Sequence, residues 1–318
     1  MDDSEIFNLW VTLWPSFGHF DQFSQFEDME GIRLNSAMTS PEQLKKEISI
    51  LNARPSKVPL WFDVKARQLR VVETIPDPNY LIIRINHPIG VELPTNIIFK
   101  GGEDPAILGS IEEDGYLLRM AANPRYNVKA GESFHIRHPS LRRLKKEIYT
   151  PIELEKIELF KAYGCKRWFI SYVEDWEEVN QLRDIVGPGH EFILKIESIP
   201  GLKFTRTYKP TEDTVLCAAC GDLYVELSRP SDILRALRLI IKADPEALAG
   251  SRILLSVHET ANKQPSFADF TQLDWLKEAG YKRVMLCDSL CLNREELLIA
   301  RNVFNEYKQK YVSKLHLI

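Results

Sequence analysis

Cysteine is scarce in this chain of 318 residues, which has five, an odd number that does not fit a disulfide framework. Cys217 and Cys220 have CxxC spacing, but Cys217 falls within the apolar run TVLCAA, where a buried cysteine acts as a small hydrophobic side chain. The seven histidines include no HExxH motif. We therefore expect a reduced, intracellular protein without a structural zinc site.

Long hydrophobic runs and an excess of basic residues are also lacking. No apolar run approaches the roughly 20 residues that a membrane helix needs, and the opening MDDSEIFNLW is acidic where a targeting peptide would be basic. The 41 basic and 45 acidic side chains give a net charge of -4, whereas nucleic acids are usually bound by a clustered basic surface. We expect a cytoplasmic protein with neither a membrane nor a nucleic acid as partner.

Short apolar runs alternate with helical patterns along most of the chain. Each helical pattern has apolar residues at spacings of three and four. Because alternating strands and helices imply parallel pairing, eight such runs predict an α/β fold, a closed (β/α)8 TIM barrel. The predicted strands are residues 7–13, 31–34, 58–62, 167–170, 192–196, 214–219, 253–257 and 283–286, and the predicted helices are 41–51, 151–163, 174–186, 230–242, 267–279 and 294–308.

One stretch between the third and fourth strands breaks this alternation. Its short strands lie close together and are separated by turn signals such as Asp77-Pro78-Asn79 and Asp114-Gly115. We therefore predict two domains. Residues 1–71 and 140–318 form the barrel, and residues 72–139 form a small all-β lid domain inserted after the third strand.

Charged residues follow several predicted strands, at the end where such barrels carry their active sites. Lys195 and Glu197 alternate along the fifth strand and so point to the same side. Asp222 follows the sixth strand, and two carboxylates completed by water and substrate oxygens make a typical Mg2+ site. Arg33 and Lys65 bring positive charge to the same end, as a phosphate-bearing substrate requires. The alternative is a structural ion pair between Lys195 and Glu197.

The order and spacing of these motifs resemble pyruvate kinase almost from end to end. Where that family reads RLNFSHG on its second strand, residues 33–38 here read RLNSAM, and where it reads LDTKGPEIR, residues 62–70 read FDVKARQLR. The family's KIEN is similar to KIES at residues 195–198, and its ARGDLGVE is similar to ACGDLYVE at residues 219–226. The predicted insertion falls where the family inserts its lid domain.

This resemblance implies a phosphotransferase that moves phosphate between phosphoenolpyruvate and ADP, giving pyruvate and ATP. It implies Mg2+ or Mn2+ as cofactor, with K+ as a second cation, and small molecules as the partners. The chain stops soon after the eighth predicted strand, so we expect it to lack the family's C-terminal regulatory domain. The sequence leaves the oligomeric state open.

The resemblance also implies roles for single residues. The transferred phosphoryl group would be contacted by Lys195 and Arg33, and the divalent metal would be held by Glu197 and Asp222. The remaining roles are K+ ligation by Asn35, Ser36 and Asp63, substrate binding by Gly221, Asp222, Ser256 and Lys65, and nucleotide-phosphate binding by Arg70.

Several positions depart from the family pattern. Ala37 and Met38 replace a serine and a histidine of the cation and nucleotide sites, and Cys220 and Tyr224 replace an arginine and a glycine. Val257 replaces a threonine, and a shifted register would offer Ser256 instead. Two alternatives therefore stand beside the phosphotransferase. One is a catalytically silent or repurposed relative that binds a phosphorylated metabolite or a partner; the other is a metal-dependent carbon–carbon lyase of the phosphoenolpyruvate/pyruvate barrel superfamily.

Overall fold

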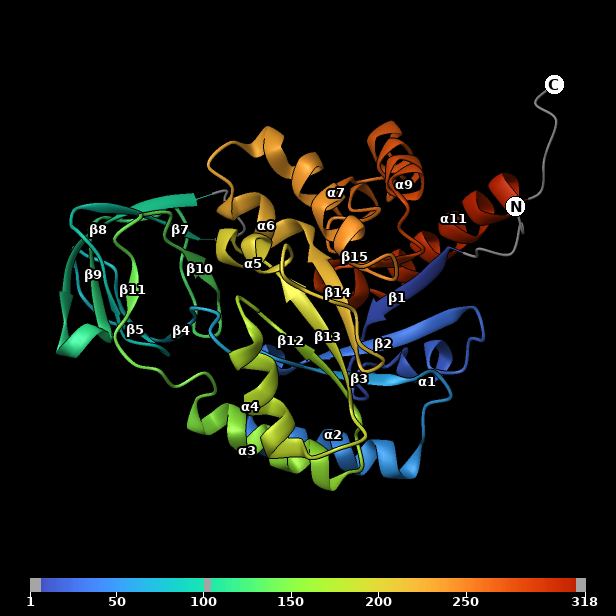
Figure 1. Cartoon of the computed structure of the whole chain (residues 1–318), viewed down its shortest axis with the longest axis horizontal. Coiled ribbons are helices and arrows are strands. Elements are labelled where there is room, and N and C mark those ends of the chain that lie inside the picture. The colour runs from blue at the N-terminus through green and yellow to red at the C-terminus, as the bar shows by residue number, and fades with distance from the viewer. Residues whose placement is uncertain (1–6, 100–103, 313–318) are drawn as a thin grey trace.

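Eight parallel strands close into a barrel in the computed structural model, which describes residues 7–99 and 104–312 (Figure 1). Residues 1–6, 100–103 and 313–318 of the predicted domains lie outside this description. Around the barrel the order is β1-β16-β15-β14-β13-β12-β3-β2, which confirms the predicted parallel barrel. The strands are β1 (Asn8–Thr12), β2 (Met29–Asn35), β3 (Leu60–Val64), β12 (Arg167–Ile170), β13 (Glu191–Ile196), β14 (Thr214–Ala219), β15 (Leu248–Gly250) and β16 (Arg283–Met285).

Helices follow the strands, and several begin at capping residues. Ser40 caps α2 through the backbone N–H of Gln43, and Ser266 caps α9 through that of Asp269. These local signals explain why the predicted starts at residues 41 and 267 agree with the structure. The helices are α1 (Phe20–Phe23), α2 (Pro41–Ala53), α3 (Pro151–Ala162), α4 (Trp176–Val186), α5 (Ile199–Phe204), α6 (Cys220–Glu226), α7 (Ile233–Ala243), α8 (Ser256–Glu259), α9 (Phe267–Ala279), α10 (Asp288–Leu292) and α11 (Arg294–Val312), with 3-10 turns η1 (Ser36–Met38), η3 (Glu113–Gly115) and η4 (Pro230–Asp232).

The seventh strand was predicted in the wrong place. It is β15, Leu248–Gly250, which pairs with β14 and β16, and not residues 253–257. Ile253 and Val257 are fully buried, but the intervening Leu254 has a φ of +51° and α8 begins at Ser256. A buried apolar run therefore follows the strand as a turn and a short helix, a case that apolar character alone does not distinguish from a strand.

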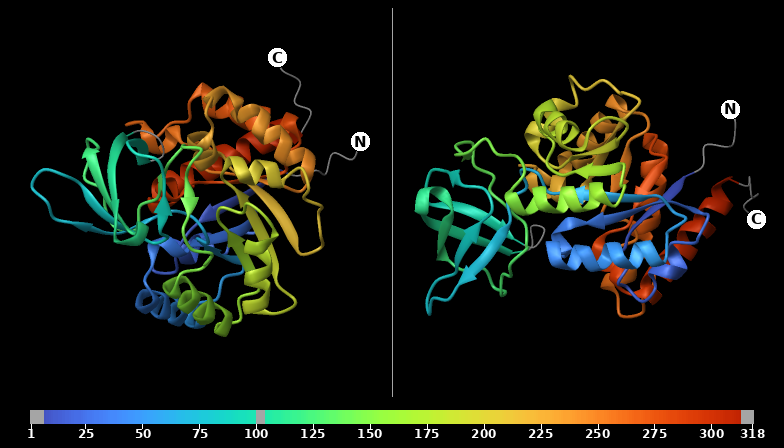
Figure 2. Two further views of the ribbon diagram at one scale, coloured as in Figure 1. Left: turned by 60° about the vertical axis from the view of Figure 1, so that its left-hand side comes forward. Right: turned by 90° about the horizontal axis from the view of Figure 1, so that it is seen from below.

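A second, antiparallel sheet is formed by residues between β3 and β12, the stretch in which we predicted the lid domain. Its strand order is β10-β7-β8-β9-β5-β4, and it has its own buried cluster, which includes Ile83, Phe99 and Phe134. Figures 1 and 2 show this sheet standing beside the barrel. The strands are β4 (Val71–Ile75), β5 (Ile82–Ile85), β7 (Thr95–Phe99), β8 (Asp104–Glu112), β9 (Leu117–Ala122) and β10 (Phe134–His135), with β6 (Ile89–Gly90) and β11 (Arg142–Arg143) pairing separately.

Large side chains fill the interior of the barrel. The ring of Trp10 lies 5.3 Å from that of Trp61 and 5.8 Å from that of Phe169, between ring centroids. Gly31 is needed beside them, because a Cβ at this position would lie 2.4 Å from the Trp10 ring. The interior is thus closed by packing, and polar side chains gather at the carboxyl-terminal ends of the strands, called the mouth below.

No helix within residues 7–99 and 104–312 is both long and apolar enough to span a membrane.

Candidate active site

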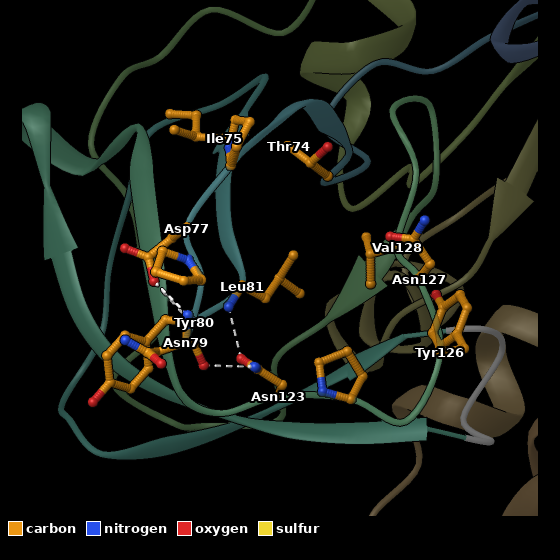
Figure 3. A pocket seen from close by; sticks show the side chains of 13 residues that line it. Thr74, Ile75, Asp77, Asn79, Tyr80, Leu81, Asn123, Tyr126, Asn127 and Val128 are labelled. Atoms are coloured by element: carbon orange, nitrogen blue, oxygen red, sulfur yellow. Dashed lines mark hydrogen bonds between the residues drawn. The ribbon is translucent and has the colours of Figure 1, made fainter.

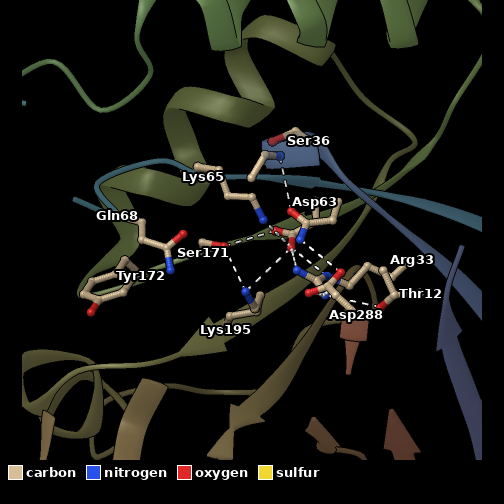
Figure 4. Close-up of polar contacts among 12 residues, drawn as sticks. Thr12, Arg33, Ser36, Asp63, Lys65, Gln68, Ser171, Tyr172, Lys195 and Asp288 are labelled. Atoms are coloured by element: carbon tan, nitrogen blue, oxygen red, sulfur yellow. Dashed lines mark hydrogen bonds and ion pairs between the residues drawn. The ribbon is translucent and has the colours of Figure 1, made fainter. Parts of the chain in front are cut away.

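Three cations converge on the carboxylate of Asp63 at the mouth (Figure 4). Asp63 Oδ2 lies 2.5 Å from Arg33 Nη2, 2.7 Å from Lys65 Nζ and 3.6 Å from Lys195 Nζ. Ser171 Oγ donates to Asp63 Oδ1 at 3.1 Å. Burial alone would raise the pKa of Asp63, but the three cations hold it well below its ordinary value. Asp63 is therefore a buried anion around which positive charge is organised.

Arg33 also pairs with a carboxylate that the sequence did not identify. Its Nη1 lies 3.2 Å from Asp288 Oδ2, and Asn35 Nδ2 donates to Asp288 Oδ1 at 3.1 Å. Burial opposes the charge of Arg33, but Asp288 and Asp63 together raise the pKa of its guanidinium. Asp288 begins α10, three residues after the eighth strand ends, so its place in the loop after a strand was the signal that could have revealed it.

Lys195 and Glu197 lie together at the end of β13, and they form the ion pair that stood as the alternative to a metal and phosphate site. Lys195 Nζ lies 2.6 Å from Glu197 Oε1, and both side chains are buried. Glu197 Oε2 accepts a hydrogen bond from the backbone N–H of Tyr172 at 2.8 Å, so each oxygen of this carboxylate has a partner. Burial raises the pKa of Glu197, with the charge of Asp222 adding to it and Lys195 opposing it. A metal ion at Oε1 would therefore share this buried oxygen with the ammonium of Lys195.

His135, on β10 of the second sheet, reaches the barrel beside Asp222. Its Nε2 lies 3.4 Å from Asp222 Oδ1 and its Nδ1 lies 2.7 Å from Glu226 Oε1. Tyr172, with a φ of +54°, places its hydroxyl 2.8 Å from His135 Nδ1 and donates to Glu226 Oε1 at 3.0 Å. Burial would lower the pKa of His135, but Asp222 and Glu226 raise it to about 9. No motif in the sequence marked His135, because the contact depends on how the second sheet meets the barrel.

The hydroxyl at the start of α6 comes from Ser251 and not from Ser256. The backbone N–H of Gly221 donates to Ser251 Oγ at 2.9 Å. Ser256 Oγ instead donates to Ser266 Oγ at 2.8 Å, and His258 Nδ1 lies 2.7 Å from Glu296 on α11. This difference follows from the displaced seventh strand, which ends one residue before Ser251. The predicted substrate role of Ser256 therefore has no support in its surroundings.

The three residues predicted to bind K+ do not fit that ion. Asn35 Oδ1 accepts from the backbone N–H of Ala37 at 3.2 Å, and Ser36 Oγ donates to Glu153 Oε1 at 3.1 Å. The Asp63 carboxylate is already paired with three cations. The oxygens of these side chains are thus engaged with different partners, and the amino group of Lys65 lies 2.7 Å from Asp63 Oδ2. Burial lowers the pKa of Lys65 to about 7, although the charge of Asp63 opposes this change.

The carboxylates predicted to hold a divalent metal fit such an ion in part. Within the described ranges, no group of three or more His, Cys, Asp or Glu side chains could hold a metal ion. Glu197 and Asp222 still offer two carboxylates, with Lys195 Nζ 2.6 Å from Glu197 Oε1 and His135 Nε2 3.4 Å from Asp222 Oδ1. Burial would raise the pKa of Asp222, but His135 and Lys195 hold it well below its ordinary value, so its oxygens are ionised. Mg2+ suits a pair of this kind because it keeps water and substrate oxygens as its other ligands.

Arg70, predicted to bind the nucleotide phosphate, lies where the barrel leads into the second sheet. Its Nε and Nη2 donate to Gln68 Oε1 at 3.0 and 2.6 Å, and its Nη1 donates to the carbonyl of Gly131. The nucleotide role of Arg70 stays a prediction.

Met38, at a position where the pyruvate kinase family has a histidine of its nucleotide site, lines a cavity of about 370 Å3 close to α2, together with Trp14.

A pocket of about 330 Å3 on the second sheet is made of turns (Figure 3). Asp77 Oδ1 accepts hydrogen bonds from the backbone N–H groups of Asn79 and Tyr80, and Asn123 Oδ1 accepts from that of Leu81. These bonds stabilise the turns themselves. None of the described residues that line this pocket is a predicted site residue.

Comparison of the sequence with known protein families and with curated proteins finds no match.

Proposed function

We propose that this chain is a pyruvate kinase-like phosphotransferase that moves phosphate between phosphoenolpyruvate and ADP with Mg2+. The observation that carries the proposal is the convergence of Arg33, Lys65 and Lys195 on Asp63 at the mouth, beside Glu197. These cations come from β2, β13 and the residue after β3, so the barrel itself fixes their positions. Rigid positive groups at a strand end are what transfer of a phosphoryl group requires.

The charge balance of the cluster favours a divalent ion with the substrate. Three cations face the carboxylates of Asp63, Glu197 and Asp288, so the charges within the cluster nearly cancel. A substrate that carries a phosphate and a carboxylate adds negative charge. Mg2+ held by Glu197 and Asp222 would offset that charge and polarise the phosphate and enolate oxygens.

The side chains of the cluster have distinct tasks in this proposal. Lys195 and Arg33 donate to oxygens of the transferred group and stabilise the charge that develops there. Asp63 orients both cations through its buried carboxylate. The backbone N–H of Gly221 donates to Ser251 Oγ at 2.9 Å, which leaves the hydroxyl hydrogen of Ser251 to donate to the substrate carboxylate.

The second sheet serves in this proposal as the inserted lid, residues 72–139. Its support is that His135 of β10 reaches Asp222 and Glu226, and that Arg70 donates to Gly131 next to that sheet. A cover at this place would exclude water from the transferred phosphoryl group.

A silent relative that binds a phosphorylated metabolite is the second candidate. The observation that favours it is again His135, because the two carboxylates that raise its pKa to about 9 keep the ring positively charged at neutral pH. This imidazolium lies 3.4 Å from Asp222 Oδ1 and so competes with Mg2+ for that carboxylate. The cations of the mouth would then bind an anion without turning it over.

Pyruvate release from phosphoenolpyruvate with ADP and Mg2+ tests the proposal, with Lys195→Met as the inactive variant. Loss of Lys195 leaves the buried carboxylate of Glu197 without its ion pair and so also destabilises the fold. The matched control is Lys156→Met, which removes another buried lysine, paired with Glu153 at 3.4 Å. We expect Lys156→Met to keep its turnover and Lys195→Met to lose it by about a hundredfold or more. Phosphoenolpyruvate binding without pyruvate release would instead favour the silent relative.

A further inference from the structure

An apolar cavity lies away from the cation cluster, between helices α6, α7 and α9. Its volume is about 660 Å3, within the range of small-molecule sites. Leu237, Leu276 and Trp275 line it, and large apolar side chains stand exposed at its rim: Phe267 is 87% and Leu234 49% exposed. Grouping of such side chains around one hollow marks a contact surface, whereas single exposed apolar residues are ordinary.

Arg252 is the charged residue among the described residues that line this cavity. It makes no ion pair with any residue in the described ranges, and its guanidinium carbon lies 5.7 Å from the ring centroid of Tyr224. A cation on an aromatic face, beside an apolar hollow and without a carboxylate partner, is complementary to an anion with an apolar body. Tyr224, which replaces a glycine of the pyruvate kinase motif, also lines this cavity.

The backbone holds Arg252 at this place by an uncommon conformation. Ser251 and Arg252 have φ values of +61° and +59°, a left-handed region that residues other than glycine rarely adopt. The side chains of both residues lie close to Gly221, because a Cβ at that position would be 2.9 Å from Ser251 Oγ and 4.0 Å from Arg252 Nε. Two successive strained residues thus direct one polar side chain to the start of α6 and the next to the cavity, and strain of this kind is concentrated at functional sites.

We propose that this cavity binds a small organic anion, with its apolar body between α7 and α9 and its anionic group on Arg252. The charge of Arg252 selects the anion, and the apolar lining selects an aromatic or aliphatic body. This site shares no residue with the cation cluster, so it does not depend on the proposed phosphotransferase activity.

The probe for this site is 8-anilinonaphthalene-1-sulfonate, an aromatic sulfonate, compared with its neutral relative N-phenyl-1-naphthylamine. Fluorescence titration of the full chain should show saturable binding of both. We expect Arg252→Gln to weaken sulfonate binding about tenfold and to leave binding of the neutral relative unchanged, since only the sulfonate gains from a charged partner. Leu234→Asp should weaken both, because it places a carboxylate at the apolar rim.

Two controls keep the result decisive. Near-ultraviolet circular dichroism must be the same for all variants, because the sulfonate also binds loosened, partly folded proteins. Equal affinity of the wild type and Arg252→Gln for the sulfonate would overturn the proposal. The proposal would also be overturned if the cavity proved to be an interface between two copies of the chain. In that case the molecular mass of the wild type would double as the protein concentration rises, Leu234→Asp would remain a monomer, and the probe would bind only the monomer.

Discussion

Asp63 is the residue on which the charges of the mouth depend. Its buried carboxylate is in ion-pairing distance of Arg33, Lys65 and Lys195, three cations that would otherwise repel one another. Removal of one partner from a buried ion pair strongly lowers the free energy of unfolding, because the other partner is left as an uncompensated buried charge. The site and the stability of the barrel are therefore coupled at this residue.

We expect Asp63→Asn to lower the free energy of unfolding by about 3–5 kcal/mol, because it removes the carboxylate that pairs with buried Lys65 and that Arg33 and Lys195 share. Urea unfolding measures the change. Glu155→Gln is the control, since its ion pair with Lys45 is exposed and such pairs contribute about 1 kcal/mol or less. Equal losses for the two variants would contradict the role of Asp63.

The amino group of Lys65 lies 2.7 Å from Asp63 Oδ2 and so occupies one oxygen of this carboxylate. We therefore expect K+ to stabilise the protein no more than tetramethylammonium does at the same ionic strength. Thermal unfolding in the two chloride salts checks this, and it needs no catalytic activity. A rise in Tm specific to K+ would show that a potassium site forms after all.

Elements with strong local patterns were predictable, and those set by their neighbours were not. The sixth strand, Thr214–Ala219, agrees with its prediction because it is one apolar run between turns. The seventh is only Leu-Ala-Gly, which carries little strand signal beside the more apolar ILLSV that follows. Likewise, period-two alternation predicted that Lys195 and Glu197 share one side of the strand, but no local pattern indicates that His135 contacts Asp222 from another sheet.

The position of the seventh strand makes a prediction about two serines. Ser251 Oγ lies 2.9 Å from the backbone N of Gly221 at the start of α6, whereas Ser256 is bonded to Ser266 at the cap of α9. We expect Ser251→Ala to lower kcat/KM for phosphoenolpyruvate about ten- to a hundredfold, as the loss of a positioned donor does, and Ser256→Ala to leave it within about twofold. Steady-state kinetics of both variants decide it, and the reverse order would restore the predicted register.

At the scale of the whole molecule, the junction between the barrel and the second sheet is fixed by buried polar contacts. His87, which follows β5, hydrogen-bonds through Nε2 to the carbonyl of Ala66 at 2.8 Å, and Ala66 follows β3 with a φ of +40°. Near the end of the second sheet, where the chain returns to the barrel, His135 of β10 contacts Asp222 and Glu226. The two histidines thus anchor the second sheet at its departure from the barrel and at its return.

His87 gives the junction a pH dependence. Burial lowers the pKa of His87 from 6.5 to about 4. Below pH 6.5 this histidine is therefore protonated in the unfolded chain, whereas in the folded chain it stays neutral down to about pH 4. Stability should therefore fall as the pH drops through this window, by up to about 3 kcal/mol at about 1.4 kcal/mol per pKa unit. Urea unfolding from neutral pH downward measures this slope. We expect His87→Gln, which cannot ionise, to reduce the slope, and an unchanged slope would contradict the assignment.

Pyruvate release from phosphoenolpyruvate, ADP and Mg2+ tests the central claim most directly. The account predicts turnover in the wild type and in Lys156→Met. In folded Lys195→Met, turnover should fall by about a hundredfold or more, because the positive charge of Lys195 lies at the transferred phosphoryl group. Turnover in Lys195→Met equal to that of Lys156→Met would contradict the claim that the cluster around Asp63 is the catalytic centre.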